Sequence, residues 1–319
     1  MRQQSFAAGD FETYRKPTRR ERFLDEMERV VPWAELCALI APAYPGEPVG
    51  AGRRPVGLER MLRIYFLQHW FNLSDPAVEE ALYDSRAMRA FVGIDLGREP
   101  APDETTVCKF RHLLEGEGLG EQLFVAVGEY LQVHGLSIST GTIVDATIIN
   151  APGSTKNREK QRDPDMRQTK KGNQWYFGMK AHIGADSQTK LIHSVVATPA
   201  NVHDSQVLID LLHGEETRVW GDAAYTGQRD IIRERAPKAR DFTQQKATRH
   251  RPLTEYQRTA NRTKSSVRAK VEHIIGVIKR VFGFAKVRYR GLTKNAHRLF
   301  VTCALANLFM VRRHLLRVA

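Results

Sequence analysis

The chain has 319 residues, of which 42% are hydrophobic, so it has the size and composition of a globular protein. Its formal net charge of +13 favours a polyanionic partner, because each phosphate that Lys or Arg neutralises releases counterions. The longest apolar stretch, residues 299–311, is shorter than the roughly 20 residues that span a bilayer, so we expect no membrane segment. The N-terminus lacks the apolar core of a signal peptide. Three widely spaced cysteines suit a reducing cytoplasm and give no zinc-site pattern.

Two basic segments carry most of the positive charge. Residues 238–290 contain fifteen Lys or Arg against three acids, and residues 156–171 contain seven against three. Such a run is often only a solvated surface. Because both segments flank the acidic residues discussed below, we interpret them as surfaces for an anionic partner.

The first 135 residues predict a helical region. Apolar residues recur at helical spacing in four segments: 22–31, 58–66, 75–82 and 103–114. Residues 46–55 form a Gly/Pro/Arg connector. Lys109 and Arg111 are expected on the outward face of the last helix, and short helices with a basic face are typical of helix-turn-helix DNA-binding regions. A plain helical bundle is the alternative that the periodicity leaves open.

After residue 140 the pattern changes to strands mixed with helices. A β-rich run at 142–149 has Asp145 in its middle, and a short strand at 218–222 ends on Asp222. The other predicted elements are strands at 175–183 and 191–198 and helices at 204–212, 228–235, 267–282 and 299–316. This order matches an RNase H-like fold. We therefore predict an α/β protein, with a helical DNA-binding and oligomerisation region at 1–135 and a catalytic domain with a mixed sheet at 136–319.

Asp145, Asp222 and Glu272 are the candidate catalytic residues. A charge inside a strand is costly unless it is paired or binds a metal, although a lone strand Asp is more often structural and a helical Glu more often solvated. Two strand carboxylates and one helical carboxylate can hold two divalent ions roughly 3.5–4 Å apart. Hard oxygen ligands favour Mg²⁺, with Mn²⁺ as a substitute. Such ions activate a water or a 3′-hydroxyl for attack on a phosphodiester, so no protein nucleophile is required.

The helix around Glu272 supports a site for a large anion. At about 100° per residue, Arg268, Glu272 and Lys279 fall within ~40° of each other, at the edge of an apolar arc. The residues beside them have little side-chain bulk, which we interpret as space for the anion: Ser265, Gly276 and Gly283.

Three blocks of the sequence carry a specific resemblance. They are Val144-Asp145-Ala146-Thr147, Gly221-Asp222-Ala223-Ala224-Tyr225 and Arg268-x3-Glu272-x6-Lys279. In order and spacing they resemble the catalytic blocks of DDE transposases of bacterial insertion sequences, in the IS-five family and related to the IS-four group. The third block departs from the family at Ser265, where the family has Tyr. The likeness runs from about residue 55 to the C-terminus, and includes residues 103–111 and 171–178.

The resemblance implies an RNase H-like catalytic domain with two Mg²⁺ ions on Asp145, Asp222 and Glu272. It also implies cutting of double-stranded DNA at terminal inverted repeats, and transfer of the 3′-hydroxyl ends into target DNA, within a homodimer or higher multimer in the bacterial cytoplasm. Arg268 and Lys279 would contact phosphates near the scissile bond. We expect further DNA contacts from Lys170, Lys171, Trp175, Lys109 and Arg111. The segment 241–265 falls where related enzymes carry an insertion, and we predict a short basic DNA-clamping loop there.

Several other residues have a structural interpretation beside a functional one. Asp204 is most simply the N-cap of the helix that follows it. Trp175 either belongs to the core or stacks on a base, and Tyr225 either packs locally or hydrogen-bonds in the site. Three further acids are assigned to a loop or a turn: Asp163, Asp165 and Asp186.

Two other functional classes are carried as alternatives. A stand-alone RNase H-like nuclease would use the same acids but stop after hydrolysis, and the long basic helical N-terminus argues against it. A non-catalytic DNA-binding derivative could lose the acids, whereas all three are present.

Overall fold

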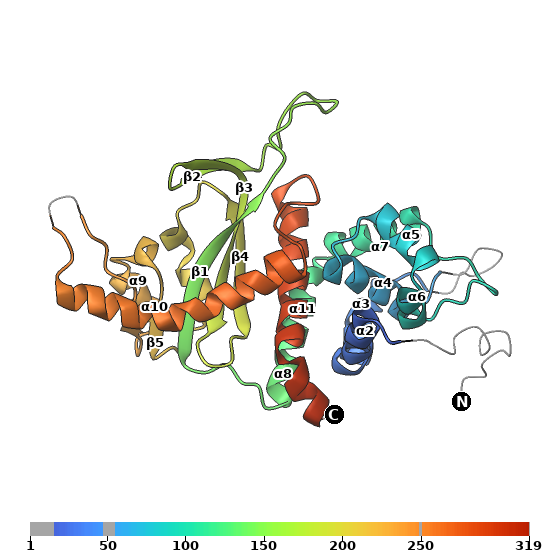
Figure 1. Cartoon of the computed structure of the whole chain (residues 1–319), viewed down its shortest axis with the longest axis horizontal. Helices are drawn as coiled ribbons and strands as arrows, with labels where there is room; N and C mark the ends of the chain where they lie inside the picture. Colours follow the sequence, from blue (N-terminus) through green and yellow to red (C-terminus); the bar gives the residue numbers. More distant parts are fainter. Residues whose placement is uncertain (1–15, 47–54, 249–250, 319) are drawn as a thin grey trace.

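The computed structural model describes residues 16–46, 55–248 and 251–318. Helices from the first half of the chain lie on one side and a mixed sheet from the second half on the other, with the long helix α11 (Leu292–Val318) between them (Figure 1). The chain is therefore α/β with a helical N-terminal region, as predicted. Most of the predicted connector at 46–55 lies outside the described residues.

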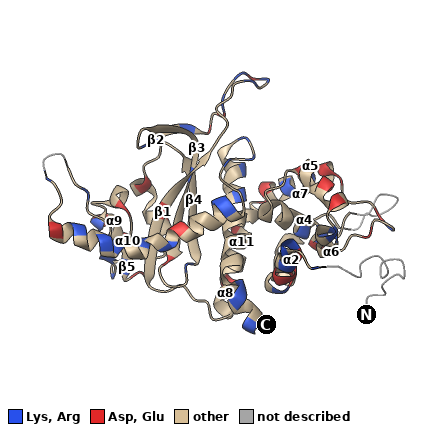
Figure 2. Ribbon diagram, in the orientation of Figure 1, with Lys and Arg blue, Asp and Glu red and all other residues tan. Residues whose placement is uncertain are grey.

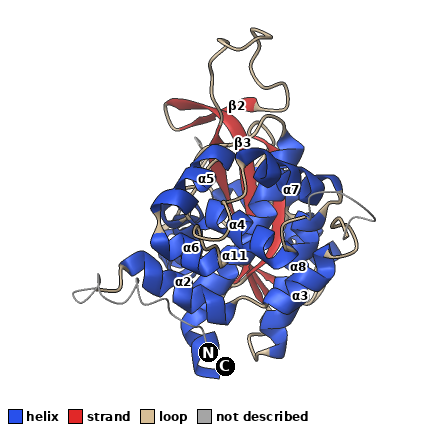
Figure 3. Cartoon of the chain, turned by 90° about the vertical axis from the view of Figure 1, so that its right-hand side faces the viewer, coloured by secondary structure: helices blue, strands red, loops and turns tan. Residues whose placement is uncertain are grey.

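The N-terminal helices start at residues that satisfy the free N–H groups of the first turn. Thr18, Ser74 and Asp103 each accept a hydrogen bond from a backbone N–H three residues later. Viewed from the right-hand side of Figure 1, the N-terminal helices form a layer in front of the sheet (Figure 3). They are α2 (Arg19–Val30), α3 (Trp33–Ile40), α4 (Leu58–Trp70), α5 (Asp75–Asp84), α6 (Arg86–Val92), α7 (Glu104–Gly116) and α8 (Leu119–Val133).

The second half of the chain forms a mixed sheet. Its strands are β1 (Gly141–Asn150), β2 (Arg167–Lys171), β3 (Gln174–Asp186), β4 (Ile192–Pro199), β5 (Arg218–Trp220) and β6 (Arg240–Asp241). β3 pairs antiparallel with β1, β2 and β4, while β5 pairs parallel with β1 and with β6. An antiparallel meander that continues into parallel strands through its first strand is the predicted RNase H-like arrangement. The sequence pattern does not predict β2, because all of its residues are polar.

Helices and 3-10 turns cover the sheet. They are η1 (Asp204–Val207), η2 (Ile209–Leu211), η3 (Ala223–Tyr225), α9 (Arg229–Arg235), α10 (Glu255–Gly276) and the π-helix η4 (Val277–Val281). α10 crosses the sheet and extends past its edge (Figure 1). It begins well before the predicted residue 267, because Thr254 and Gln257 form a capping box there. The second half of the predicted clamping loop is therefore helical, and that part of the prediction is wrong.

α11 joins the two halves of the molecule. By length and composition alone it could span a membrane, which corrects the expectation that no segment qualifies. Of its most apolar window, 61% is buried inside the protein, where it packs against α8, β4 and α2. Buried apolar residues of the N-terminal helices, the sheet and α11 belong to one continuous core. α11 is thus the central core helix of this fold.

Candidate functional site

Asp145 and Asp222 are brought together by the pairing of β1 with β5. The two strands run parallel, and Ile143 of β1 pairs with Trp220 of β5. Each aspartate follows two residues later, so both reach the same height, and the alternation of side chains turns both to the same face. They line one cavity of about 240 Å³.

Asp145 is nearly buried, with 13% of its side chain exposed. Its Oδ1 accepts a hydrogen bond from the N–H of Ala146 at 2.8 Å, and its Oδ2 accepts one from Arg268 Nη1 at 2.7 Å. Burial raises the pKa of Asp145 from 3.8 to about 6; Arg268 and the Ala146 N–H oppose this rise, and the charge of Asp222 adds to it. A cation beside Asp145 therefore stabilises its ionised form.

Asp222 is positioned by the turn that follows β5. Its Oδ1 accepts a hydrogen bond from the N–H of Ala224 at 2.8 Å and caps η3. A Cβ at Gly221 would lie 2.9 Å from the Tyr225 ring and 3.1 Å from Val144, so only glycine fits without a shift. The Gly-Asp-Ala-Ala-Tyr block is therefore a tight turn that fixes the carboxylate and buries Tyr225 next to it.

Glu272 lies on α10 and stays outside the cavity. Its side chain is 64% exposed, and it accepts a hydrogen bond from Arg268 Nη2 at 3.3 Å, so Arg268 bridges Glu272 and Asp145. Within the described parts of the chain, no three His, Cys, Asp or Glu side chains lie close enough to hold a metal ion. The carboxylates still suit a hard cation, because a side-chain cation already lies between Asp145 and Glu272.

Lys279 binds the backbone of β1. Its Nζ donates to the carbonyl oxygen of Ile148 at 2.7 Å and to Thr147 Oγ1 at 3.1 Å. Burial lowers the pKa of Lys279, and the nearby charge of Lys171 lowers it further. Since Thr147 and Ile148 both line the cavity, this ammonium lies behind the cavity wall.

The small residues beside Glu272 differ in their surroundings. Gly276 lines a cavity of about 430 Å³ with Arg280 and Arg312, so space for an anion stays a prediction there. A Cβ at Gly276 would lie 2.8 Å from the Arg280 guanidinium. Gly283 has φ +69° and ends the helix against Asn72 of the N-terminal region. Ser265 Oγ accepts a hydrogen bond from Gln244 Nε2, in the segment before α10. Gly283 and Ser265 are therefore explained by the helix end and by local packing.

The cavity contains a further carboxylate, which its sequence position predicts to be a helix N-cap. Asp204 lines it together with Asp145 and Asp222. The N-cap of η1 is His203, whose side chain accepts a backbone hydrogen bond from the first turn, so the prediction that Asp204 caps this helix is wrong. Asp204 Oδ1 accepts instead from Lys180 Nζ at 2.8 Å.

The hairpin of β2 and β3 places cations and an aromatic ring beside the cavity. Lys170 and Lys171 are exposed and contribute to the cavity lining. Trp175 is 64% exposed, so the alternative that it belongs to the core is wrong. Its ring centroid lies 5.9 Å from Lys170 Nζ. An exposed ring beside an ammonium can stack on a nucleic-acid base.

The two predicted DNA contacts on α7 have opposite environments. Lys109 is exposed. Arg111 is 5% exposed and forms ion pairs with Asp75 at 2.9 Å and Glu115 at 3.0 Å, so its predicted outward position is wrong. Its guanidinium also lies 4.2 Å from the centroid of the Tyr289 ring. This ring contact connects α7 to the C-terminal part of the chain.

The acids assigned to loops and turns bind backbone groups, in agreement with that assignment. Asp163 and Asp165 accept hydrogen bonds from the N–H groups that open α11, where the partial positive charge of the helix favours a carboxylate. Asp186 accepts hydrogen bonds from the backbone of the turn between β3 and β4.

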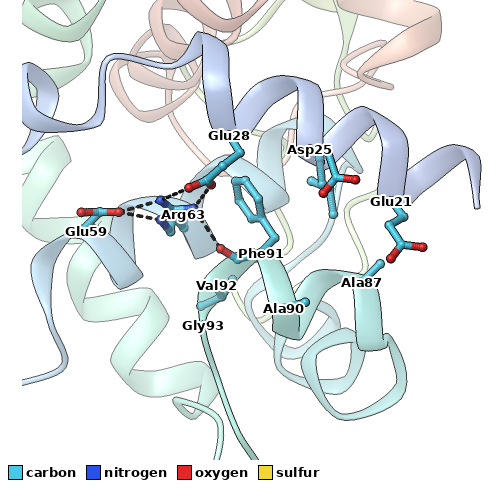
Figure 4. A pocket seen from close by; sticks show the side chains of 11 residues that line it. Glu21, Asp25, Glu28, Glu59, Arg63, Ala87, Ala90, Phe91, Val92 and Gly93 are labelled. Atoms are coloured by element: carbon cyan, nitrogen blue, oxygen red, sulfur yellow. Dashed lines mark hydrogen bonds and ion pairs between the residues drawn. The ribbon is translucent and has the colours of Figure 1, made fainter. Parts of the chain in front are cut away.

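A second cavity, of about 360 Å³, lies among the N-terminal helices and is acidic. Figure 4 shows Arg63 between the carboxylates of Glu28 and Glu59, with Glu21 and Asp25 further along α2. The Arg63 side chain is only 11% exposed, and its guanidinium also lies over the Trp33 ring. These contacts give Glu28, Glu59 and Arg63 a role in packing the N-terminal helices. The excess of carboxylates in the cavity does not suit a polyanion.

Comparison with known proteins finds a matching family for each half of the chain. Residues 137–308, more than half of the chain, match the family described as "Transposase DDE domain", and residues 12–113 match "Transposase domain (DUF772)". Among solved structures, the chain is similar to the piggyBac transposase in its synaptic complex with hairpin DNA. The TM-score is 0.49 at 11% identity, over 95% of this chain and 78% of that one.

Proposed function

We propose, on the premise that the chain belongs to the transposases with a DDE domain, that it cuts DNA at the terminal inverted repeats of an insertion sequence and transfers the 3′-hydroxyl ends into target DNA. The observation that carries this proposal is the shared cavity of Asp145, on β1, and Asp222, two residues past the end of the parallel strand β5. Arg268 connects Glu272 to that pair. The spacing of the three sequence blocks supports the IS-five branch of the family.

Asp145, Asp222 and Glu272 would hold two divalent ions, Mg²⁺ with Mn²⁺ as a substitute. Bound there, such ions activate a water or a 3′-hydroxyl and stabilise the departing oxygen. The chain itself fixes two carboxylates on β1 and β5 and supplies the third from α10. Because Arg268 occupies Asp145 Oδ2, metal binding there requires the guanidinium to move to another anion. A DNA phosphate is the anion that the proposed reaction offers.

Double-stranded DNA would bind the basic surface around the cavity. Lys170, Lys171 and Trp175 of the β2–β3 hairpin are exposed there. Lys and Arg are spread along α10 where it crosses the sheet (Figure 2). Lys109 would extend the contact to the N-terminal helices. A homodimer or higher multimer in the bacterial cytoplasm would hold the two ends of one element together.

The test is a cleavage and strand-transfer assay on a duplex that carries one end of the element encoding this chain, with Mg²⁺, Mn²⁺ or EDTA. Wild type is compared with Asp145→Asn, Asp222→Asn and Glu272→Gln, and with the exposed Asp84→Asn as a matched control. We expect metal-dependent nicks and joined products from wild type and the control. Each site variant should lose about 10³-fold in rate or more, because metal ions supply several kcal/mol of transition-state stabilisation.

Each other outcome selects a different conclusion. Nicks without joined products would identify a nuclease. Binding of the end by wild type without any cleavage would identify a non-catalytic DNA-binding derivative. Site variants that cut as fast as wild type would show that these acids are not catalytic.

A further inference from the structure

Asp204 shares a cavity with Asp145 and Asp222, although it comes from another part of the sheet. It is the first residue of η1, which follows β4, and 21% of its side chain is exposed. None of the three sequence blocks contains it. Its position in the cavity therefore follows from the path of the chain after β4, which brings η1 against η3, the turn that follows Asp222.

Lys180 holds one oxygen of Asp204. Its Nζ donates to Asp204 Oδ1 at 2.8 Å and to the carbonyl oxygen of Val202 at 2.7 Å, and Lys180 itself lines the cavity with 13% of its side chain exposed. An ammonium this far from solvent needs an anionic partner. Asp204 Oδ2 has no hydrogen-bond partner among the described residues, so this oxygen can accept a hydrogen bond from a molecule in the cavity.

Two buried polar atoms near these carboxylates lack hydrogen-bond partners among the described residues. The Tyr225 hydroxyl is fully buried without a hydrogen bond in the described part of the chain, and the charges of Asp204, Asp145 and Asp222 all act on it. His182 Nδ1 is also buried without a hydrogen bond, 3.9 Å from Asp204 Oδ1, while its Nε2 binds Thr198. Buried polar groups are rarely left unpaired. Neither residue lines the cavity, so ordered water that connects them to it would satisfy both atoms.

We propose that Asp204 is a positioning residue for a hydrated divalent cation: Asp145 and Asp222 bind the ion, and Asp204, held by Lys180, accepts hydrogen bonds from its water ligands. The inference rests on the proposed function and adds an acid to it. Mg²⁺ usually keeps several waters and takes one or two carboxylates directly. Contact through water also agrees with the absence, in the described residues, of three acidic or His side chains at ligand distance.

The experiment measures Mn²⁺ binding to the full chain without DNA, by calorimetry and by the electron paramagnetic resonance signal of free Mn²⁺. Asp204→Asn keeps the shape of the side chain but removes its charge. We expect a 10–100-fold loss of Mn²⁺ affinity, the usual effect of removing a group that hydrogen-bonds metal ligands. Asp210→Asn, an exposed aspartate on the neighbouring η2, is the matched control and should bind as wild type does.

Tyr225→Phe tests the same idea without disturbing the Lys180 pair. If nothing polar binds near the hydroxyl, removing an unpartnered buried group leaves Mn²⁺ affinity unchanged and the protein at least as stable. We expect instead a severalfold loss of Mn²⁺ affinity with the unfolding temperature in EDTA preserved. This variant decides the question if Asp204→Asn fails to fold.

Asp145→Asn separates failure of this inference from failure of the proposed function. If Asp145→Asn loses Mn²⁺ binding while Asp204→Asn and Tyr225→Phe bind as wild type does, Asp204 has no role toward the ion and only this inference falls. If Asp145→Asn binds Mn²⁺ as well as wild type, the metal site itself is misplaced and both proposals fall.

Discussion

At the scale of single residues, Arg268 determines the charge balance of the acidic site. Its guanidinium donates to Asp145 and to Glu272, and 22% of its side chain is exposed. A guanidinium between two carboxylates neutralises charge that metal ions would otherwise neutralise. Its Nε is buried without a partner among the described residues, so it still has a donor for a phosphate oxygen. Arg268 is therefore suited to exchange a carboxylate for DNA.

The raised pKa of Asp145 predicts a pH dependence of stability in the metal-free protein. In the folded chain this carboxyl keeps its proton up to about pH 6, whereas in the unfolded chain it loses the proton near 3.8. Between these values deprotonation favours the unfolded state, so the free energy of unfolding falls as pH rises through that window. The full difference is about 3 kcal/mol, from 1.36 kcal/mol per pKa unit.

Urea unfolding in EDTA between pH 4 and 7 measures this dependence, taken as the difference between wild type and Asp145→Asn. The exposed Asp84→Asn serves as the control and should follow wild type across the range. If wild type and Asp145→Asn show the same slope with pH, burial does not perturb Asp145.

At the scale of elements, η4 changes the helical phase between Glu272 and Lys279, whereas Arg268 lies beside Glu272 as the helical wheel predicts. The wheel assumes 3.6 residues per turn and puts Glu272 and Lys279 on one face. The chain becomes a π-helix at Val277–Val281, whose wider turns change that phase. Lys279 consequently points at the backbone of β1, whereas Glu272 is exposed. Local helix geometry, rather than residue identity, separates the two charges.

Contact of the β2–β3 hairpin with DNA can be tested by substituting its exposed residues and measuring DNA affinity. Trp175→Ala should weaken binding of single-stranded or distorted DNA by about 1–3 kcal/mol, the usual value of a base stacked on an aromatic ring. Because no charge is lost, the slope of log affinity against log salt should not change. Lys170→Gln should instead lower that slope by about 0.9 for duplex DNA.

Fluorescence anisotropy across a salt series distinguishes these effects. Tyr83→Ala, another exposed aromatic but on α5, is the control and should leave both affinity and slope unchanged. Wild-type affinity in Trp175→Ala at every salt concentration would contradict a stacking role for this ring.

At the scale of the whole molecule, Asn72 connects the N-terminal helices to the catalytic half. Its Oδ1 accepts from Arg288 at 2.7 Å and from Arg298 at 3.1 Å, and its Nδ2 donates to the carbonyl oxygen of Gly283 at 3.2 Å. Arg298 is 1% exposed, and its Nε and Nη1 lack partners among the described residues. Asn72 has φ +52°, which asparagine tolerates better than most residues. The end of η4 is therefore attached to the N-terminal region.

Asn72→Ala should lower the free energy of unfolding by about 2–3 kcal/mol, because it leaves a donor of the buried Arg298 guanidinium unpaired. Asn173→Ala, at the exposed turn between β2 and β3, should change stability little. Chemical denaturation of the two variants gives the comparison, and equal stability of both would show that Asn72 does not hold the two halves together. Hydrogen exchange around residues 283–291 should increase in Asn72→Ala only.

Local patterns in the sequence identify most of the elements for physical reasons. Asp145 on its strand, the capped N-terminal helices and the strand that ends at Asp222 follow from alternation, helical spacing and cap residues, which act over a few residues. The same rules miss β2, because a polar hairpin strand carries no hydrophobic signal. They also start α10 too late, because its first turns are mostly polar and apolar spacing begins only at Val267.

The sequence by itself determines the family, the α/β class and the two carboxylates that parallel strands can place together, since these depend on residue identity, order and short-range periodicity. Only the tertiary structure decides that Arg111 is buried in ion pairs, that Trp175 is exposed, and that Asp204 lies in the cavity of Asp145 and Asp222. Each of these depends on which distant segment packs against the residue. Burial of apolar residues in the shared core around α11 determines this packing, and no local sequence pattern predicts it.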